Sequence, residues 1–185
     1  MADPSALRPI QTHYQGYTFR SRLEARWAVF FDTLAFRWEY EPEGYVLQDG
    51  AWYLPDFWLP QVSMFAEVKP ACLGEDIVEI GEEAMSKVVG LVEATQHPTI
   101  ILDGIPRDTN YWAVWPDPIL GWTWNDVWLS SHYRHHLNQN PHIYADTGFS
   151  LDERRHGVPP NIEYLAECPG VLAARSARFG RDGRG

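Results

Sequence analysis

Cysteine is almost missing from this chain of 185 residues, and long apolar runs are missing as well. The two cysteines, Cys72 and Cys168, lie too far apart for a zinc knuckle or a disulfide framework, which is typical of a reduced, cytoplasmic setting. No window approaches 18 consecutive apolar residues, so we expect no membrane span. The first residues lack the basic patch and apolar run of a secretory signal, so we do not expect one.

Lysine is equally scarce, since Lys69 and Lys87 stand beside thirteen arginines, and the formal net charge is −10. An acidic balance argues against a protein that coats nucleic acid through a uniformly basic surface. The charges are unevenly distributed, however, with six acids in residues 75–93 and six arginines in residues 154–185. The sequence is therefore compatible with a locally basic surface on an acidic protein.

Length and composition predict a globular domain with short appendages. The chain is 45% hydrophobic and 22% charged, which is ordinary for a globular protein. We place the core domain at residues 17–129, after an N-terminal tail at 1–16. Residues 130–185 form a C-terminal extension, which we expect to be partly irregular with a terminal helix.

Apolar periodicity predicts one helix over residues 20–36 and another over 75–96. The remaining core consists of short, aromatic, β-favouring runs separated by turn residues, of which Asp49-Gly50 is a good hairpin signal. These runs are residues 37–41, 45–47, 51–59, 62–69, 99–102, 111–115 and 120–129. This order predicts an α/β fold with a mixed central β-sheet flanked by helices. No glycine-rich phosphate loop is present.

Two acids and a lysine converge in the segment from Tyr53 to Lys69. In a tight hairpin closed at Pro60-Gln61, Asp56 would lie opposite Phe65, and the period of two would place Asp56, Glu67 and Lys69 on one face. The other face would be apolar. Carboxylates so placed repel each other unless a cation lies between them, and oxygen ligands suit Mg²⁺. The residues therefore favour phosphodiester hydrolysis, and the alternative is a solvated Glu–Lys pair on an edge strand.

This pattern resembles the PD-(D/E)xK nuclease superfamily, through Pro55-Asp56 followed by Glu67-Val68-Lys69. The segment around Glu24 also resembles the first helix of that family. The gaps of 32 and 11 residues between Glu24, Asp56 and Glu67 are close to those of phage endonuclease I type junction resolvases. The resemblance covers roughly residues 17–115.

The resemblance implies a restriction-endonuclease-like core and hydrolysis of DNA that depends on Mg²⁺, with Mn²⁺ as a substitute. Asp56 and Glu67 would be metal ligands, joined by the backbone carbonyl of Val68. Lys69 would position the attacking water or stabilise the transition state. Glu24 would be a further ligand, direct or through water. The catalytic set implied is thus Glu24, Asp56, Glu67 and Lys69.

Glu24 has a second explanation that the spacing alone favours. Ser21 and Glu24 form a capping box, in which the Glu24 carboxylate would reach back to the backbone amide of Ser21. A role in the site and a role in the cap are both open at this point.

DNA contacts are expected from arginines near the first helix and near the C-terminus, where guanidinium groups could grip phosphates. They are Arg20, Arg22, Arg26, Arg175 and Arg178. An aromatic belt could stack bases, fill the core or form a homodimer seam. Its members are Tyr111, Trp112, Trp115, Trp122, Trp124 and Trp128. A histidine cluster, from His132 to His142, is expected to lie in a surface loop rather than to bind metal.

The leading hypothesis is a metal-dependent DNA endonuclease, with a branched or junction substrate suggested by the motif spacing. A non-catalytic module is the main alternative, in which the nuclease fold binds DNA or a protein partner. A third reading is an exonuclease, or a nuclease subunit of a defence or recombination complex.

Overall fold

A computed structural model describes residues 9–70, 81–107, 110–130, 142–146 and 169–179 of the chain. Three helices lie within them, α1 (Arg22–Thr33), α2 (Glu82–Thr95) and α3 (Pro169–Ser176). The strands are β1 (Thr12–Tyr14), β2 (Tyr17–Phe19), β3 (Glu39–Tyr40), β4 (Tyr45–Val46), β5 (Trp52–Tyr53), β6 (Phe57–Leu59), β7 (Met64–Lys69), β8 (Thr99–Asp103), β9 (Asn110–Asp117), β10 (Gly121–Ser130) and β11 (His142–Asp146).

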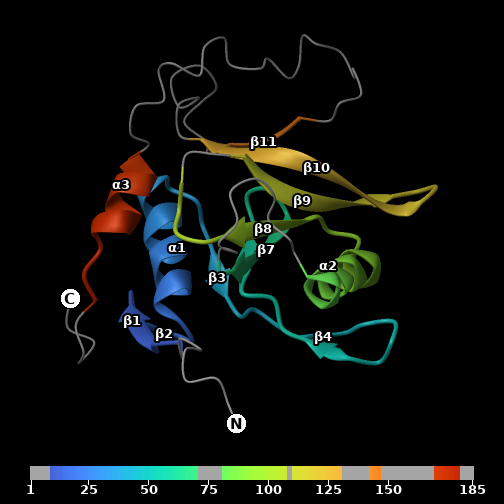
Figure 1. The fold of residues 1–185 in the computed structure, drawn as a ribbon, viewed down its shortest axis with the longest axis horizontal. Coiled ribbons are helices and arrows are strands. Elements are labelled where there is room, and N and C mark those ends of the chain that lie inside the picture. Colours follow the sequence, from blue (N-terminus) through green and yellow to red (C-terminus); the bar gives the residue numbers. More distant parts are fainter. Residues whose placement is uncertain (1–8, 71–80, 108–109, 131–141, 147–168, 180–185) are drawn as a thin grey trace.

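The main sheet is mixed and runs in the order β11-β10-β9-β8-β7-β6-β3. Its neighbouring strands are antiparallel except β7 and β8, which are parallel and are connected through α2. The predicted α/β fold with a mixed sheet and helices is therefore confirmed. Two hairpins lie outside this sheet, β1–β2 beside α1 and β4–β5 below α2 (Figure 1).

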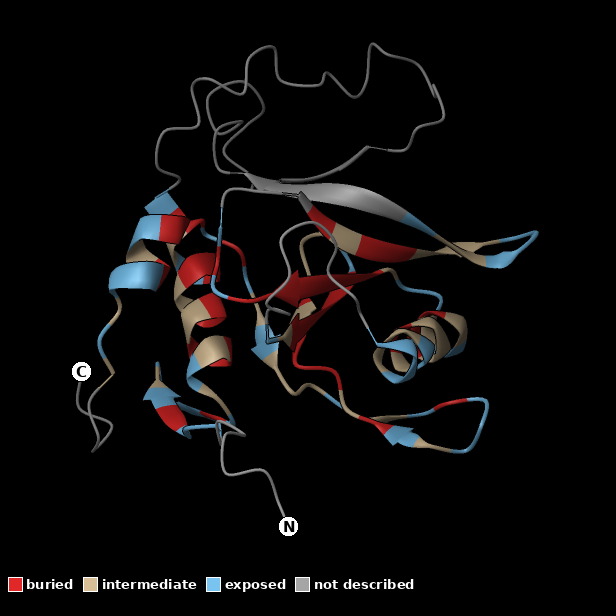
Figure 2. Cartoon of the chain, viewed as in Figure 1, coloured by how far each residue is buried: buried red, intermediate tan, exposed pale blue. Residues whose placement is uncertain are grey.

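The helices cover opposite faces of the sheet, as alternate side chains of its strands show. Phe57, Ala66 and Ile100 belong to one apolar cluster with the buried faces of α1 and α3. Ile101 belongs to another, with Val88 and other residues of α2. Strands β7 and β8 lie between the two layers and are buried along nearly all their length (Figure 2). Packing on both faces therefore fixes β7 and β8, and with them the positions of the side chains at the ends of these strands.

The β6–β7 hairpin differs in register from the one expected. Trp58, and not Asp56, lies opposite Phe65, and Leu59 pairs with Met64. The connection spans residues 60–63 instead of two residues, and Ser63 adopts a positive φ of 50°. A shift of two positions keeps every side chain on its expected face, so the face expected to be apolar is apolar, and it packs under α1.

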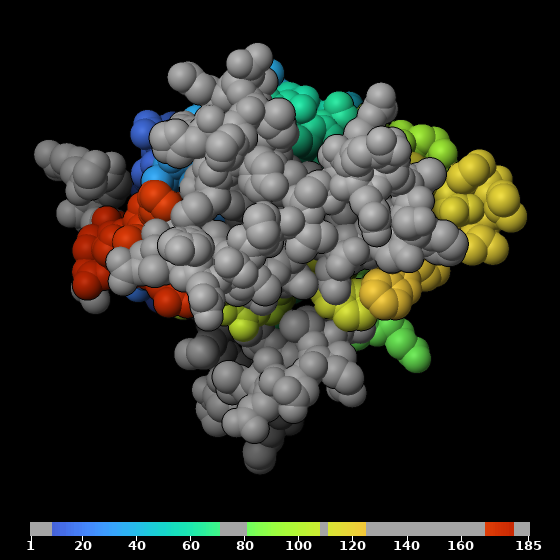
Figure 3. All heavy atoms as spheres, turned by 90° about the horizontal axis from the view of Figure 1, so that it is seen from above, coloured from blue at the N-terminus to red at the C-terminus, as the bar shows by residue number. Residues whose placement is uncertain are grey.

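Both segments expected to flank the core contribute to the fold. Residues 1–16, assigned to a tail, contain β1, which pairs with β2. Within residues 130–185, β11 extends the main sheet beside β10, and α3 packs on α1. The space-filling view from above shows α3 and the first hairpin at one end of the molecule, and the β9–β10 turn at the other (Figure 3). The terminal helix expected in this extension corresponds to α3, whereas β1 and β11 were not predicted.

The contact between α1 and α3 depends on a glycine. A Cβ atom at Gly170 would lie 2.9 Å from Phe30 Cδ2 and 3.0 Å from Leu34 Cγ, closer than packed cores allow. We expect Gly170→Ala to lower the free energy of unfolding by about 1–3 kcal/mol through overpacking, although alanine usually stabilises a helix relative to glycine. Urea denaturation measures the change.

Gly81→Ala is the matched control, because an added Cβ at this position meets no atom within 4 Å. Its effect should stay below about 1 kcal/mol, which is the scale of a change at a helix N-cap. A Gly170→Ala protein as stable as the unmodified chain would contradict this account of the α1–α3 contact.

Candidate active site

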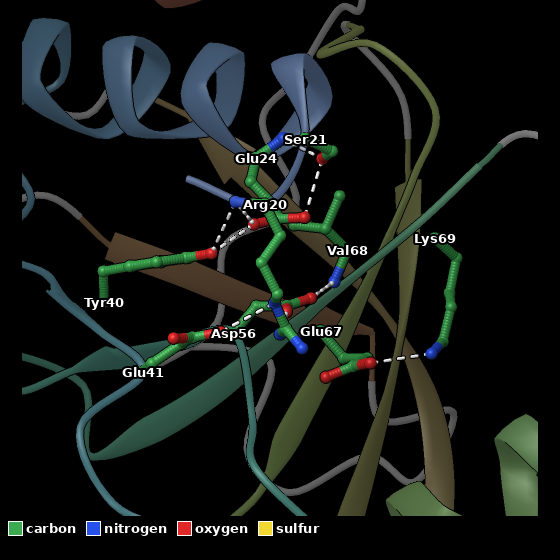
Figure 4. Close-up of polar contacts among 9 residues, drawn as sticks. All are labelled: Arg20, Ser21, Glu24, Tyr40, Glu41, Asp56, Glu67, Val68 and Lys69. Atoms are coloured by element: carbon green, nitrogen blue, oxygen red, sulfur yellow. Dashed lines mark hydrogen bonds and ion pairs between the residues drawn. The ribbon is translucent and has the colours of Figure 1, made fainter. Parts of the chain in front are cut away.

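The acids singled out in the sequence lie where β6 begins and β7 ends, beside the first turn of α1 (Figure 4). Phe57 pairs with Ala66, so the same register places Asp56 opposite Glu67. Glu67 and Lys69 follow each other on one face of β7, the face turned toward α2. The hairpin therefore brings the three residues of the motif together, as predicted.

Asp56 is 5% exposed and has a partner at each carboxylate oxygen. Oδ1 accepts a hydrogen bond from Arg20 Nη2 at 2.7 Å, and Oδ2 accepts one from the backbone N–H of Val68 at 2.8 Å. Burial raises the pKa of Asp56 to about 8, and the negative charges of Glu67 and Glu24 add to the rise. The Val68 amide and Arg20 oppose it without cancelling it. The protonated form of Asp56 is therefore favoured below about pH 8.

Glu67 is as deeply buried as Asp56, and only one of its oxygens is paired. Oε1 lies 2.7 Å from Lys69 Nζ. Oε2 is shielded from solvent and has no hydrogen-bond partner among the described residues. A buried carboxylate oxygen without a partner costs free energy, so we expect either a ligand or the neighbouring Tyr53 hydroxyl, which interacts with Glu67, to satisfy it.

Tyr53 adds a second buried polar atom that sequence reasoning missed. Its hydroxyl makes no hydrogen bond of normal geometry among the described residues, but it is close enough to Glu67 for a hydrogen bond to that carboxylate to raise its pKa, and its ring belongs to the apolar cluster on the α2 side. Burial raises its pKa, and the neighbouring charge of Glu67 raises it further. In the sequence Tyr53 is one of many aromatic residues in apolar runs, and no signal distinguishes it.

Glu24 takes part in the N-terminal cap of α1. Its backbone N–H donates to Ser21 Oγ at 3.1 Å, and its Oε1 accepts from the same hydroxyl at 2.7 Å. Its Oε2 accepts from the Arg20 amide at 3.1 Å and from the Tyr40 hydroxyl at 2.5 Å. The carboxylate thus reaches back to Arg20 rather than to the expected Ser21 amide. It is close enough to raise the pKa of Asp56, but its own oxygens are occupied.

Arg20, expected to contact DNA, lies inside the site. Its guanidinium bridges Asp56 and Glu41, with Nε 2.7 Å from Glu41 Oε1. The side chain is nevertheless 55% exposed, so it can leave Asp56 without disturbing the core. Arg20 therefore supplies a removable positive charge at the position where the acids converge.

A further charged pair lies beside Lys69 at the end of β8. Lys69 and Asp103 are register partners in the parallel β7–β8 pair. Asp103 is 6% exposed and forms an ion pair with Arg107. Sequence reasoning missed both residues, since the pairing of β7 with β8 is a long-range contact that local spacing does not reveal.

The other predicted DNA-contacting arginines lie on α1, on α3 or just after α3. Arg22, Arg175 and Arg178 are exposed. Arg26 donates to the backbone carbonyls of Ala174 and Arg175 at the C-terminal end of α3. Burial lowers the pKa of Arg26, and the charges of Arg22 and Arg178 lower it further, so these three groups form one basic cluster. Part of this cluster thus holds α3 in place.

The predicted aromatic belt is divided between core and surface. Tyr111 and Trp115 belong to the core on the α1 side, and Trp122 packs with α2 residues. Trp112 and Trp124 stack with ring centroids 4.4 Å apart, and Trp124 is 50% exposed. The side chain of Trp128 and the cluster from His132 to His142 lie outside the part of the chain whose side chains are described.

The structure does not bring Glu24, Asp56 and Glu67 together as the three carboxylate ligands that were expected. Among the described residues, no group of three or more His, Cys, Asp or Glu side chains is arranged to hold a metal ion. Mg²⁺ typically takes only one or two protein carboxylates and keeps its waters. The two facing carboxylates, Asp56 and Glu67, are the number of protein ligands that such an ion would take.

Comparison with protein-family models, with curated proteins and with solved structures finds no match for this chain. None of the helices in the described residues has both the length and the apolar character needed to cross a bilayer.

The raised pKa of Asp56 predicts a pH-dependent stability. Because this pKa lies above the ordinary value of 3.8, folding takes up a proton between about pH 4 and pH 8. The free energy of unfolding should therefore fall as pH rises through this window, by up to about 1.4 kcal/mol per pH unit. Asp56→Asn should reduce the fall and make the protein more stable than the unmodified chain above pH 8. Urea titrations with a chelator at pH 5, 7 and 8.5 measure this.

The exposed Glu39 on β3 provides the control, since Glu39→Gln should leave the pH dependence unchanged. If the Asp56→Asn protein lost stability with pH as steeply as the unmodified chain, the buried carboxyl would not be the group that takes up the proton.

Proposed function

We propose that the chain is a metal-dependent nuclease of the PD-(D/E)xK type that hydrolyses phosphodiester bonds in DNA. The observation that carries the proposal is the buried pair Asp56 and Glu67 at one end of a hairpin, with Glu67 Oε2 unpaired and Lys69 alongside. Burying two facing carboxylates is unfavourable unless a cation joins them, so their placement argues for a function rather than for stability.

The arrangement of elements supports the same proposal. A first helix, an antiparallel hairpin and a parallel strand joined through a second helix follow the order that a restriction-endonuclease-like core implies. Acid and amine sit at the ends of the central strands, where side chains are held rigidly. Rigid placement is what a catalytic group requires, because small displacements cost rate.

Each residue has a role that follows from its position. Asp56 and Glu67 would hold Mg²⁺, or Mn²⁺ in its place, with the carbonyl of Val68 as a further ligand. Bound there, the ion would polarise the scissile phosphodiester and favour ionisation of a nearby water. Lys69, now paired with Glu67, would stabilise charge on the phosphate or orient the attacking water. Glu24 would act through Asp56 or through water, since its own oxygens are engaged in the cap.

One observation favours a second function, a non-catalytic module that binds DNA or a protein partner. The Arg20 guanidinium already occupies Asp56 Oδ1 and could serve as a permanent replacement for the metal. In that case the acids would be a structural remnant, and the exposed arginines of α1 and α3 would carry the binding.

Cleavage assays test the nuclease directly. We expect the chain to cut DNA in Mg²⁺ or Mn²⁺ and not in chelator. Asp56→Asn, Glu67→Gln and Lys69→Met should each reduce the rate by at least about 100-fold, because each removes a ligand or a charge that acts on the phosphate. Binding of labelled DNA, measured by fluorescence anisotropy in Ca²⁺, should persist. Glu39→Gln is the control and should cut normally.

The same assay separates the modes of cleavage. Duplex, nicked, flapped and four-way DNA distinguish a branched substrate from a linear one, and cutting of closed circular DNA distinguishes an endonuclease from an exonuclease. Cleavage that survived intact in Asp56→Asn or Glu67→Gln would contradict the proposed site.

Metal titration separates the nuclease from the non-catalytic module. We expect the unmodified chain to bind Mn²⁺ in a calorimeter, and Arg20→Gln to bind it up to about fivefold more tightly. The gain corresponds to the roughly 1 kcal/mol of a half-exposed ion pair that the metal no longer has to break. An unmodified chain without Mn²⁺ affinity, beside an Arg20→Gln protein that binds the ion, would favour the module instead.

A further inference from the structure

The end of the parallel β7–β8 pair carries charges of alternating sign, which continue from the motif to two residues outside it. Glu67 Oε1 lies 2.7 Å from Lys69 Nζ, Lys69 is the register partner of Asp103, and Asp103 forms an ion pair with Arg107. Neighbouring strands lie about 4.8 Å apart, and register partners point to the same face. Asp103 and Arg107 therefore continue the acid–amine pair of the candidate site onto the next strand.

The backbone that carries Arg107 is held by contacts on three sides. Gly104 N donates to Lys69 O at 2.7 Å, which joins the loop to the end of β7. Trp27 Nε1 donates to Gly104 O at 2.9 Å, which joins the loop to α1. The Tyr111 hydroxyl lies 2.9 Å from both the backbone N and the backbone O of Arg107. Arg107 is thus fixed relative to Lys69 and α1.

The ion pair itself is asymmetric. Asp103 is almost completely buried, whereas the Arg107 side chain is 43% exposed. Among the described residues the guanidinium contacts Asp103 through Nη2 alone, which leaves the other N–H donors without a side-chain partner in that part of the chain. The buried Asp103 therefore holds the half-exposed Arg107 side chain near the end of the sheet.

Two explanations of this arrangement compete. Arg107 could serve only to neutralise Asp103, as structural ion pairs do. The position of Arg107 favours a second role, in ligand binding. Ligands of α/β sheets bind beyond the carboxyl ends of parallel strands, and β7 and β8 are the parallel strands of this sheet. A planar, pre-oriented guanidinium is also the group best suited to grip a phosphate.

We infer that Arg107 binds a backbone phosphate of the nucleic-acid strand next to the one at Glu67 and Lys69, and that Asp103 orients it. The contact is to the phosphodiester and carries no base sequence information. The inference rests on the proposed function, since it assumes that the strand lies across the ends of β7 and β8.

The salt dependence of DNA binding tests the inference. Labelled duplex DNA is titrated in Ca²⁺ at 50–200 mM NaCl, and log K is plotted against log salt. One lost phosphate contact reduces the slope by about 0.9, so Arg107→Gln should show this reduction with weaker binding. Arg107→Lys should recover the slope, because lysine keeps the charge that displaces a counterion.

Two further variants control for position and for folding. Arg37 is exposed and its backbone contacts Gln61 in the β6–β7 turn, at the opposite end of the hairpin from Asp56, so Arg37→Gln should keep the slope of the unmodified chain. Arg107→Gln leaves Asp103 buried without its partner. The double variant with Asp103→Asn removes that penalty and should show the same reduced slope.

The outcomes separate the two proposals. If the unmodified chain binds DNA and both Arg107→Gln variants keep its slope, Arg107 is only the counter-charge of Asp103, and the inference is overturned while the nuclease proposal stands. If the unmodified chain binds no DNA at any salt concentration, the proposed function fails together with the inference.

Discussion

The burial of two facing carboxylates at one end of a hairpin is the constraint on which the rest of this structure depends. Asp56 and Glu67 are brought opposite each other by the β6–β7 register, and both are almost completely buried. Ionising both carboxyls would place two like charges side by side away from solvent, and the raised pKa of Asp56 means that a proton removes one of these charges below about pH 8. The chain tolerates this cost because Arg20, the Val68 amide and Lys69 each relieve part of it.

Helix α1 links the core to these acids. Its apolar side, including Trp27 and Phe31, fills the space over the sheet, so the first turn is fixed where the hairpin ends. The cap formed by Ser21 and Glu24 then occupies the start of the helix and places Arg20 over Asp56. Packing on one side of the helix therefore determines the electrostatics at its end.

Sequence reasoning found the motif because its information is local. The alternation of side chains in β6 and β7 placed Asp56, Glu67 and Lys69 on one face even though the expected register was wrong by two positions. Contacts between distant segments were not accessible in this way. Lys69 and Asp103 become register partners only through the parallel pairing of β7 with β8, and α2 lies between these two strands in the sequence. The strands β1 and β11 owe their form to pairing with neighbours rather than to their own composition.

The distribution of charge is compatible with the nucleic-acid substrate that we propose for this acidic chain. Buried acids lie at the strand ends, and exposed guanidinium groups lie on α1, on α3 and in the loop after β8. Lysine is rare here, and arginine is better suited to this arrangement, because a fork of fixed donors can be aimed by a buried carboxylate. Two arginines are held by a buried carboxylate in this way. Arg20 is bound to Asp56, and Arg107 is bound to Asp103 beside Lys69. Net charge therefore says less about the partner of this protein than the pairing of its few buried acids does.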